Sequence, residues 1–183
     1  MKKLVILGAG TAGTMMLNKL MPVLDPDEWQ VTIVDQDQKH YYQPGFLFIP
    51  FGIYGPEDVV KPKRNFFPPG AHVVFAGIDA IEPDRNRVRL EDGQILPYDW
   101  LIVATGAKTA PDETEGLKGE GWYRNIFDFY TVEGATALGE FLQDWKGGRV
   151  VINITEMPIK CPVAPLEFAF LADWWFTEQG LRD

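Results

Sequence analysis

The sequence is short of the residues that cross-link a chain or bind nucleic acid. Cys161 is the only cysteine among 183 residues, which excludes an internal disulfide and any zinc site built from several cysteines. Basic residues are also scarce: 26 acidic residues outnumber 17 basic ones, and the formal net charge of −9 would repel a phosphate backbone. We therefore expect no nucleic-acid partner.

Long hydrophobic runs are missing as well. The chain opens with two lysines and a short apolar run, but glycines interrupt that run too early for a secretory signal peptide. The most apolar late segment is broken by Glu167 and Asp173, so no stretch reaches the roughly 18 apolar residues of a membrane span. We expect neither a signal peptide nor a transmembrane segment in this chain, and any membrane contact should be peripheral.

Apolar residues themselves are plentiful and follow an alternating pattern of strands and helices. They make up 46% of the chain, which suffices for a packed core at this length. Lys2–Leu7 predicts a strand, the apolar residues from Ala12 to Leu20 have helical spacing, and Gln30–Asp35 predicts a second strand that ends on a carboxylate. This βαβ unit predicts an α/β, Rossmann-like fold.

Four more strands are predicted downstream, at His72–Gly77, Arg87–Leu90, Gln94–Tyr98 and Trp100–Thr105. Asp92-Gly93 lies between the middle two, which should form a hairpin because glycine tolerates the positive φ of a tight turn. The apolar strand Trp100–Thr105 should be buried. Residues 39–70 are rich in proline, glycine and aromatics, which predicts a long irregular segment of the kind that is usually functional.

The second half of the chain begins another strand–helix unit. Thr131 is a suitable cap for a helix whose apolar stripe runs from Ala135 to Trp145 and which should end at Gly147-Gly148. Arg149–Ile154 then predicts a strand. Pro162–Gln179 predicts a helix that is apolar nearly all round, so a further layer should cover it.

The turn after the first strand carries a dinucleotide-binding pattern. Gly8, Gly10 and Gly13 fit G-x-G-x-x-G, and Asp35 follows Gly13 by 22 residues. Gly8 allows the tight turn, Gly10 lets the backbone approach a pyrophosphate, and Gly13 lets helix and strand pack closely; Asp35 can accept hydrogen bonds from ribose hydroxyls. The alternative is that these glycines only form a turn in an unrelated α/β protein. The glycine pattern also does not distinguish an NAD site from an FAD site. The candidate binding residues here are Gly8, Gly10, Thr11, Ala12, Gly13 and Asp35.

The second strand–helix unit lacks such a turn. Residues 155–162 contain no glycine, their side chains would block a pyrophosphate, and Glu156 would repel it, so nicotinamide binding is not expected there. Cys161 stands instead at the mouth of the following helix, beside Lys160. The helix dipole and this cation favour the reactive thiolate. A buried thiol that only packs is the open alternative.

Three segments resemble one family of flavoenzymes. The KCPVAPLE run at 160–167, the HYYQPGFLFIPFG run at 40–52 and the N-terminal glycine pattern resemble the sulfide:quinone oxidoreductases and the flavoprotein subunit of flavocytochrome sulfide dehydrogenase. The predicted hairpin and the Ala104-Thr105-Gly106 turn resemble the FAD domain of the glutathione-reductase structural family. The resemblance therefore implies a Rossmann-like FAD-binding domain of glutathione-reductase type within the FAD-dependent pyridine nucleotide-disulfide oxidoreductases.

The resemblance also implies roles for individual residues. FAD would be the cofactor, with Ala104, Thr105 and Gly106 near it. Cys161 would be one of two redox cysteines on the reactive side of the flavin, and Glu167 would assist acid/base steps unless it is an ordinary solvated helix residue. The aromatic segment Tyr41–Tyr54 would line the flavin pocket, with Pro44 and Gly45 allowing close backbone approach, unless it forms a hydrophobic domain contact.

The implied reaction oxidises sulfide through a cysteine disulfide/persulfide relay and passes electrons through FAD to quinone. The intact enzyme would then sit on a membrane surface, and a homo-oligomer is left open. Two alternatives stay open. A type II NADH:quinone oxidoreductase has the same architecture but needs a glycine-rich second turn, and a non-catalytic flavin-binding module would suit the short length and single cysteine.

This sequence departs from the family in two ways. Many members carry a third cysteine near the position of Trp122–Phe127, with a histidine close after it, and this sequence has neither, which excludes a thioether to the flavin there. The second redox cysteine and the membrane-docking helices would lie beyond residue 183. We expect residues 1–113 to form the N-terminal part of an FAD-binding domain and 114–183 a truncated second one, and this piece alone to be inactive.

Overall fold

The computed structural model describes residues 1–182, and the chain forms two compact units. Unit one joins Met1–Tyr41 with Val60–Gly106, and unit two joins Tyr42–Val59 with the chain from Ala107 onward. A segment of unit two therefore interrupts unit one in the sequence. The domain limits expected from the sequence stay a prediction.

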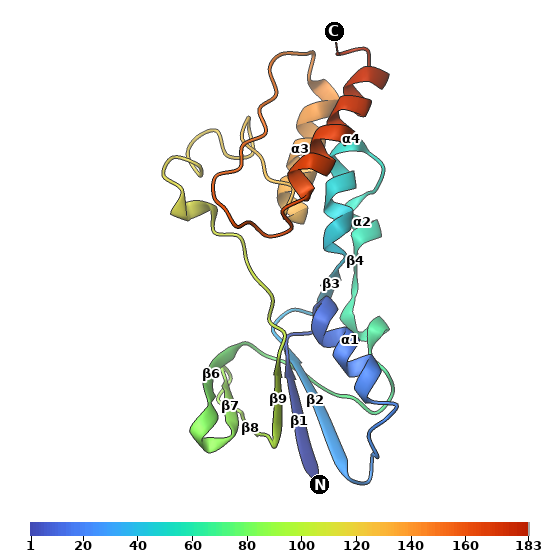
Figure 1. The fold of residues 1–183 in the computed structure, drawn as a ribbon, viewed down its shortest axis with the longest axis vertical. Helices are drawn as coiled ribbons and strands as arrows, with labels where there is room; N and C mark the ends of the chain where they lie inside the picture. Colours follow the sequence, from blue (N-terminus) through green and yellow to red (C-terminus); the bar gives the residue numbers. More distant parts are fainter. Residues whose placement is uncertain (183) are drawn as a thin grey trace. The chain divides into compact units, whose positions relative to one another are not determined.

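Unit one is built on a four-stranded sheet in the order β5-β2-β1-β9 (Figure 1). Its strands are β1 (Lys2–Leu7), β2 (Trp29–Asp35), β5 (His72–Phe75) and β9 (Trp100–Val103). All three pairings are parallel, and β1 has a neighbour on each side. The predicted α/β fold and its βαβ unit are confirmed.

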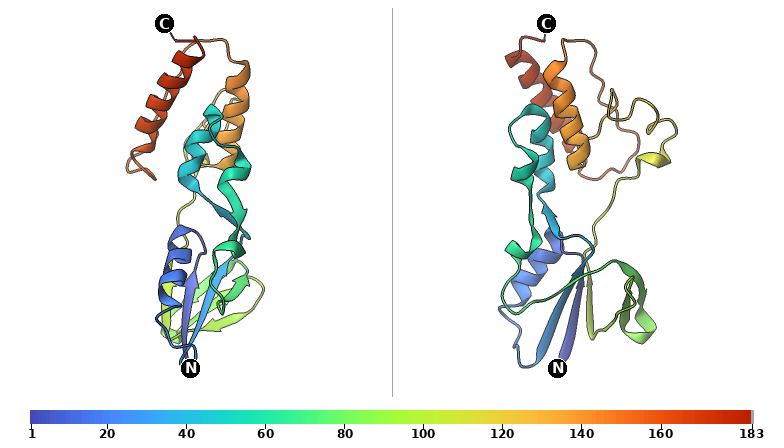
Figure 2. Two further views of the ribbon diagram at one scale, coloured as in Figure 1. Left: turned by 90° about the vertical axis from the view of Figure 1, so that its right-hand side faces the viewer. Right: turned by 180° about the vertical axis from the view of Figure 1, so that it is seen from behind.

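Both faces of this sheet are covered within unit one. Helix α1 (Thr11–Leu20) lies on one face, and a three-stranded antiparallel sheet lies on the other (Figure 2). Because side chains alternate along a strand, Leu4 and Ile6 of β1 pack with Leu17 of α1, whereas Val5 and Leu7 pack toward the antiparallel sheet. Full burial of each such aliphatic side chain stabilises the fold by about 1.5–3 kcal/mol, so β1 is the centre of the core.

The antiparallel sheet consists of β6 (Ile78–Glu82), β7 (Arg87–Leu90) and β8 (Ile95–Pro97), with a short 3₁₀ turn, η3 (Pro83–Arg85), between the first two. β7 and β8 form the predicted hairpin. Gly93 has a φ of +87°, the conformation for which a glycine was expected at this turn.

The expected burial of the strand at Trp100–Thr105 is wrong. β9 is the last strand in the sheet order and ends at Val103. Trp100 is 64% exposed and Val103 is 58% exposed. An edge strand has only one neighbour, so a run of apolar residues does not by itself guarantee cover.

Short elements replace the expected irregular segment at residues 39–70. They are β3 (Lys39–Tyr41), the 3₁₀ helix η1 (Gln43–Phe51), α2 (Pro56–Val59), β4 (Val60–Pro62) and the 3₁₀ helix η2 (Lys63–Phe66). β3 and β4 pair in antiparallel fashion. Prolines and glycines keep each element short but do not prevent it: Pro44 lies in the first turn of η1, and Gly52 ends that helix with a φ of +70°.

Unit two packs η1 against two longer helices, α3 (Val132–Asp144) and α4 (Ala164–Glu178); it also contains the short turn η4 (Pro111–Glu113). Thr131 caps α3 as predicted, because its Oγ accepts a hydrogen bond from the Gly134 amide at 3.0 Å. The helix ends at Asp144, before the predicted glycines. The core of unit two consists of Leu47, Phe51, Leu142, Phe168 and Ala172.

The strand predicted at Arg149–Ile154 is wrong. These residues form no ladder with any strand in the described part of the chain. Val151 is 74% exposed and Ile154 is 48% exposed. A strand is defined by the hydrogen bonds it makes to a neighbour, and the apolar pattern alone cannot supply one.

Candidate functional site

The glycine turn and the Ala104-Thr105-Gly106 turn meet in unit one. β1 and β9 are adjacent parallel strands, so the turns that follow them emerge at the same edge of the sheet. Gly8 has a φ of +93°, and a Cβ placed on it would lie 2.3 Å from the Ala104 carbonyl oxygen. Only glycine fits this contact, and the two predicted cofactor turns are therefore packed directly against each other.

Gly13 and Gly10 play different roles in the same turn. A Cβ on Gly13 would lie 1.7 Å from the Gly8 carbonyl oxygen, so the start of α1 packs on the turn itself. A Cβ on Gly10 would meet no protein atom within 4 Å, and Gly10 is exposed. The structure therefore leaves open space beside Gly10, where the sequence pattern expects a pyrophosphate.

The first turn of α1 is suited to an anion. Gly10 is the N-cap and provides no side-chain cap, and the first turn contains no acidic residue. Thr11 and Ala12 are exposed at this end of the helix. Free backbone N–H groups and the positive end of the helix dipole are available there, and these features together with the open space at Gly10 fit a bound pyrophosphate.

Asp35 lies at the end of β2 and is tied to the glycine turn. Its Oδ2 accepts a hydrogen bond from the Ala9 amide at 2.6 Å, and its Oδ1 accepts one from the Asp37 amide at 2.8 Å. Oδ1 also forms an ion pair with Lys63 Nζ at 2.7 Å. The predicted ribose acceptor is thus held in one orientation by three donors.

Lys63 is a site residue that sequence reasoning missed. It begins η2, its side chain is 5% exposed, and its Nζ also donates to the Asp37 carbonyl oxygen at 2.8 Å. Burial raises the pKa of Asp37, but the backbone hydrogen bond at Lys39, a hydrogen bond from Tyr41 and the charge of Lys63 outweigh burial and lower it. A lysine within VKPKR gives no sequence signal that distinguishes it from its exposed neighbours.

Cys161 lies in unit two, three residues before α4, and it is exposed. The alternative of a buried thiol that only packs is therefore wrong. Its φ is +50°, a conformation that few residues other than glycine adopt. Its carbonyl oxygen accepts hydrogen bonds from the Ala164 amide at 3.1 Å and from the Tyr130 hydroxyl at 3.2 Å, so the backbone at Cys161 is held from two sides.

The groups around Cys161 belong to unit two as well. Burial raises the pKa of the Tyr130 hydroxyl, and a thiolate at Cys161 would raise it further, so this group stays a hydrogen-bond donor. Lys160 Nζ lies 3.5 Å from the Ala107 carbonyl oxygen. Glu167 is exposed in the first turn of α4, where a carboxylate interacts favourably with the helix dipole. Its catalytic role stays a prediction.

The aromatic segment of η1 has a packing role that the structure explains. Leu47 and Phe51 contribute to the core of unit two. A Cβ on Gly45 would lie 2.5 Å from Val59, so this glycine allows η1 and α2 to approach closely. Pro44 occupies the first turn of η1 and is exposed. A hydrophobic contact therefore accounts for the buried part of the segment, and the flavin contact of Pro44 and Gly45 stays a prediction.

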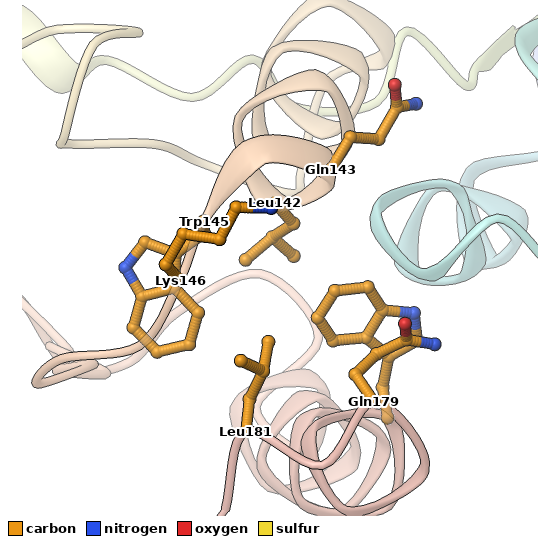
Figure 3. Close-up of a pocket in the computed structure, with 7 residues that line it drawn as sticks. Leu142, Gln143, Trp145, Lys146, Gln179 and Leu181 are labelled. Carbon is orange, nitrogen blue, oxygen red and sulfur yellow. The ribbon is translucent and has the colours of Figure 1, made fainter.

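A cavity of about 360 Å³ lies in unit two between the C-terminal ends of α3 and α4 (Figure 3). It is lined by Leu142, Gln143, Trp145, Lys146, Trp175, Gln179 and Leu181. Cys161 precedes the opposite end of α4, and 15 helical residues span about 22 Å. The cavity is therefore separate from the thiol.

Residues 1–182 contain neither a metal-binding cluster nor a membrane-spanning helix. No group of three or more His, Cys, Asp or Glu side chains is arranged to hold a metal ion in this range. No helix in the same range is long and apolar enough to cross a membrane.

Known proteins identify the family. Residues 2–152 match the family model of the pyridine nucleotide-disulphide oxidoreductases. The matched stretch includes both turns of unit one. The chain belongs to this family. The match agrees with the Rossmann-like sheet and with the paired turns at the ends of β1 and β9.

Individual members of the family resemble the chain over different lengths. The mitochondrial sulfide:quinone oxidoreductase of Dictyostelium discoideum is 30% identical over 99% of this chain and 40% of its own length. The type II NADH:quinone oxidoreductase of Staphylococcus haemolyticus is 30% identical over 78% of this chain and 34% of its own length. The chain thus spans about two fifths of the first relative and about a third of the second, and the first match extends over nearly the entire sequence.

A solved structure has the same fold. The crystal structure of the sulfide:quinone oxidoreductase from Aquifex aeolicus superposes with a TM-score of 0.74 and 23% identity, over 100% of this chain and 41% of that one. At this identity the likeness establishes the fold. It extends over unit two as well as unit one.

Proposed function

We propose that this chain is the FAD-binding part of a sulfide:quinone oxidoreductase. The observation that carries the proposal is the exposed Cys161 at the start of α4, where a second dinucleotide-binding unit would have a glycine turn. A relative with this activity in its name aligns over 99% of the chain, a stretch that includes Cys161, whereas the NADH-oxidising relative aligns over 78%. Sulfur chemistry therefore suits the second unit better than nicotinamide binding.

FAD is the cofactor that unit one would hold. Gly10 and the start of α1 would receive the pyrophosphate, and Asp35 would accept a hydrogen bond from the adenosine ribose. Ala104, Thr105 and Gly106 would contact the dinucleotide from the adjacent turn. When bound, the flavin supplies a two-electron acceptor that protein side chains lack.

Cys161 would act as a redox cysteine with a partner outside this chain. Hydrosulfide would attack one sulfur of the disulfide between the two cysteines; as the S–S bond breaks, one cysteine is left as a persulfide and the other as a thiolate. A bound flavin would supply the acceptor for the two electrons released. The exposed position of Cys161 gives sulfide access. Tyr130, which donates to its carbonyl oxygen, would hold the backbone in place, and Glu167 would transfer protons.

Quinone would be the final electron acceptor. Quinones are dissolved in membranes, so the complete protein would bind a membrane surface. No helix within residues 1–182 is long and apolar enough to cross a bilayer. Sulfide and quinone are therefore the proposed substrates.

The experiment that tests this function replaces the sulfur atom of Cys161. In the complete natural form of the protein, Cys161→Ser should abolish sulfide-dependent reduction of a soluble quinone while FAD stays bound. Met157→Leu is the matched control, because it removes the neighbouring, 66% exposed sulfur of the same loop and should leave the rate unchanged. Undiminished sulfide oxidation by the serine variant would contradict the proposal.

A type II NADH:quinone oxidoreductase is the second candidate, favoured by a relative of that name. It would require pyrophosphate binding near residues 155–162, where no glycine permits close approach. Reduction of quinone by NADH in the same assay would support it over the first proposal.

A further inference from the structure

Lys63 is the only charged residue that is buried within residues 1–182, with 4% of its surface exposed. Removing an ammonium group from water costs several kcal/mol unless the charge is paired and hydrogen-bonded. Its Nζ is satisfied by Asp35 Oδ1 at 2.7 Å and by the Asp37 carbonyl oxygen at 2.8 Å. Asp35 ends β2 and Asp37 follows it in the next turn, so this buried charge acts on the end of that strand.

The two carboxylate oxygens of Asp35 have different numbers of hydrogen-bond donors. Oδ1 receives Lys63 Nζ and the Asp37 amide, which occupies both of its lone pairs. Oδ2 receives only the Ala9 amide, within the glycine turn, and keeps one lone pair free to accept another hydrogen bond. Without Lys63 the carboxylate could rotate, and the oxygen with spare capacity would no longer be fixed beside the glycine turn.

We propose that Lys63 is a positioning residue for the cofactor ribose, which acts by fixing the orientation of the Asp35 carboxylate. The inference rests on the FAD site proposed for unit one. Lys63 also neutralises the charge of Asp35, which would otherwise repel a diphosphate bound at the start of α1. A lysine that merely tied η2 to β2 would stabilise the fold without changing how the ribose is recognised.

The ribose hydroxyl itself provides the test. Dissociation constants for FAD and for FAD that lacks the adenosine 2′-hydroxyl are measured by flavin fluorescence, using the complete natural protein freed of cofactor. In the wild type, loss of the hydroxyl should weaken binding by about 10-fold, the effect of one hydrogen bond to a charged group. In Lys63→Gln the ratio of the two constants should fall to nearly 1, as it should in Asp35→Asn.

Two controls separate positioning from stability and from charge. Val88→Ala removes buried atoms from β7 and lowers stability without touching Asp35, so it should keep the wild-type ratio. Lys19→Gln removes an exposed lysine from the last turn of α1 and should also keep it. Should the Gln variant not fold, Lys63→Arg takes its place, because it keeps the charge but its planar guanidinium displaces the carboxylate and lowers the same ratio.

The outcomes distinguish the two proposals. A wild-type protein that does not bind FAD would overturn the proposed cofactor and this inference together. A wild type that binds FAD and discriminates the hydroxyl, with an unchanged ratio in the Lys63 variants, would overturn the role of Lys63 alone.

Discussion

A Cβ methyl group would have opposite effects at Gly8 and at Gly10. At Gly8 the methyl would collide with Ala104 and the φ of +93° would be strained, whereas at Gly10 it would meet no protein atom. Gly8 is therefore a requirement of the fold, and Gly10 has no such requirement in the protein itself. The open space beside Gly10 leaves room for a bound group, which supports the pyrophosphate site.

The two glycines can be separated by alanine substitution. Gly8→Ala should lower the free energy of unfolding by at least about 2 kcal/mol, from backbone strain and the clash with Ala104. Gly10→Ala should cost less, about 1 kcal/mol at most, because glycine is preferred over alanine at a helix N-cap, yet it should weaken FAD binding by about 10-fold or more. Urea unfolding and flavin fluorescence measure the two effects. Wild-type FAD affinity in Gly10→Ala would contradict the placement of the pyrophosphate.

At this scale the sequence identifies residues whose role depends on local geometry. The three glycines and Asp35 occupy fixed positions in a strand–turn–helix unit, so their spacing is sufficient to find them. Lys63 could not be found in this way. Its role arises from a contact with a residue 28 positions earlier (63 − 35), and nothing in its immediate neighbourhood marks it as buried.

Among the elements, α4 is notable for apolar side chains on both sides. Phe168 is 6% exposed and stacks on Phe129 with a ring-centroid distance of 4.5 Å, whereas Phe170 is 75% exposed. One side of the helix therefore belongs to the core of unit two. The layer expected to cover the other side does not occur among residues 1–182.

This difference predicts unequal effects of two matched substitutions. Phe168→Ala should lower the free energy of unfolding by about 3–5 kcal/mol, because it leaves a cavity next to Phe51 and Ala172. Phe170→Ala changes the same residue type two positions along and should cost less than about 0.5 kcal/mol in this chain. Chemical denaturation monitored by circular dichroism compares them, and a similar loss in both would mean that α4 is covered on both sides.

Helices and strands could be predicted from the sequence where the residues that form them contact each other within a short stretch of chain. The β7–β8 hairpin and the Thr131 cap depend on contacts within a few residues, and both were found. The strand expected at Arg149–Ile154 failed because it needs a hydrogen-bonding neighbour from elsewhere. β9 was found, but its exposure was not, because position at the edge of a sheet is a property of the strand order.

At the scale of the molecule, unit one has the features of a dinucleotide-binding domain and unit two presents an exposed thiol at the start of α4. The family match covers unit one and part of unit two but ends before Cys161. Membership of the family therefore does not decide between sulfide and NADH as the source of electrons. That decision depends on residues 155–162, where a cysteine occurs and glycine does not.

The most direct test uses the complete natural protein, loaded with FAD and kept free of oxygen. Sulfide and NADH are added separately while the visible absorbance band of the flavin is followed. Our account predicts that sulfide bleaches the band and that NADH leaves it unchanged. Bleaching by NADH with no response to sulfide would contradict the account.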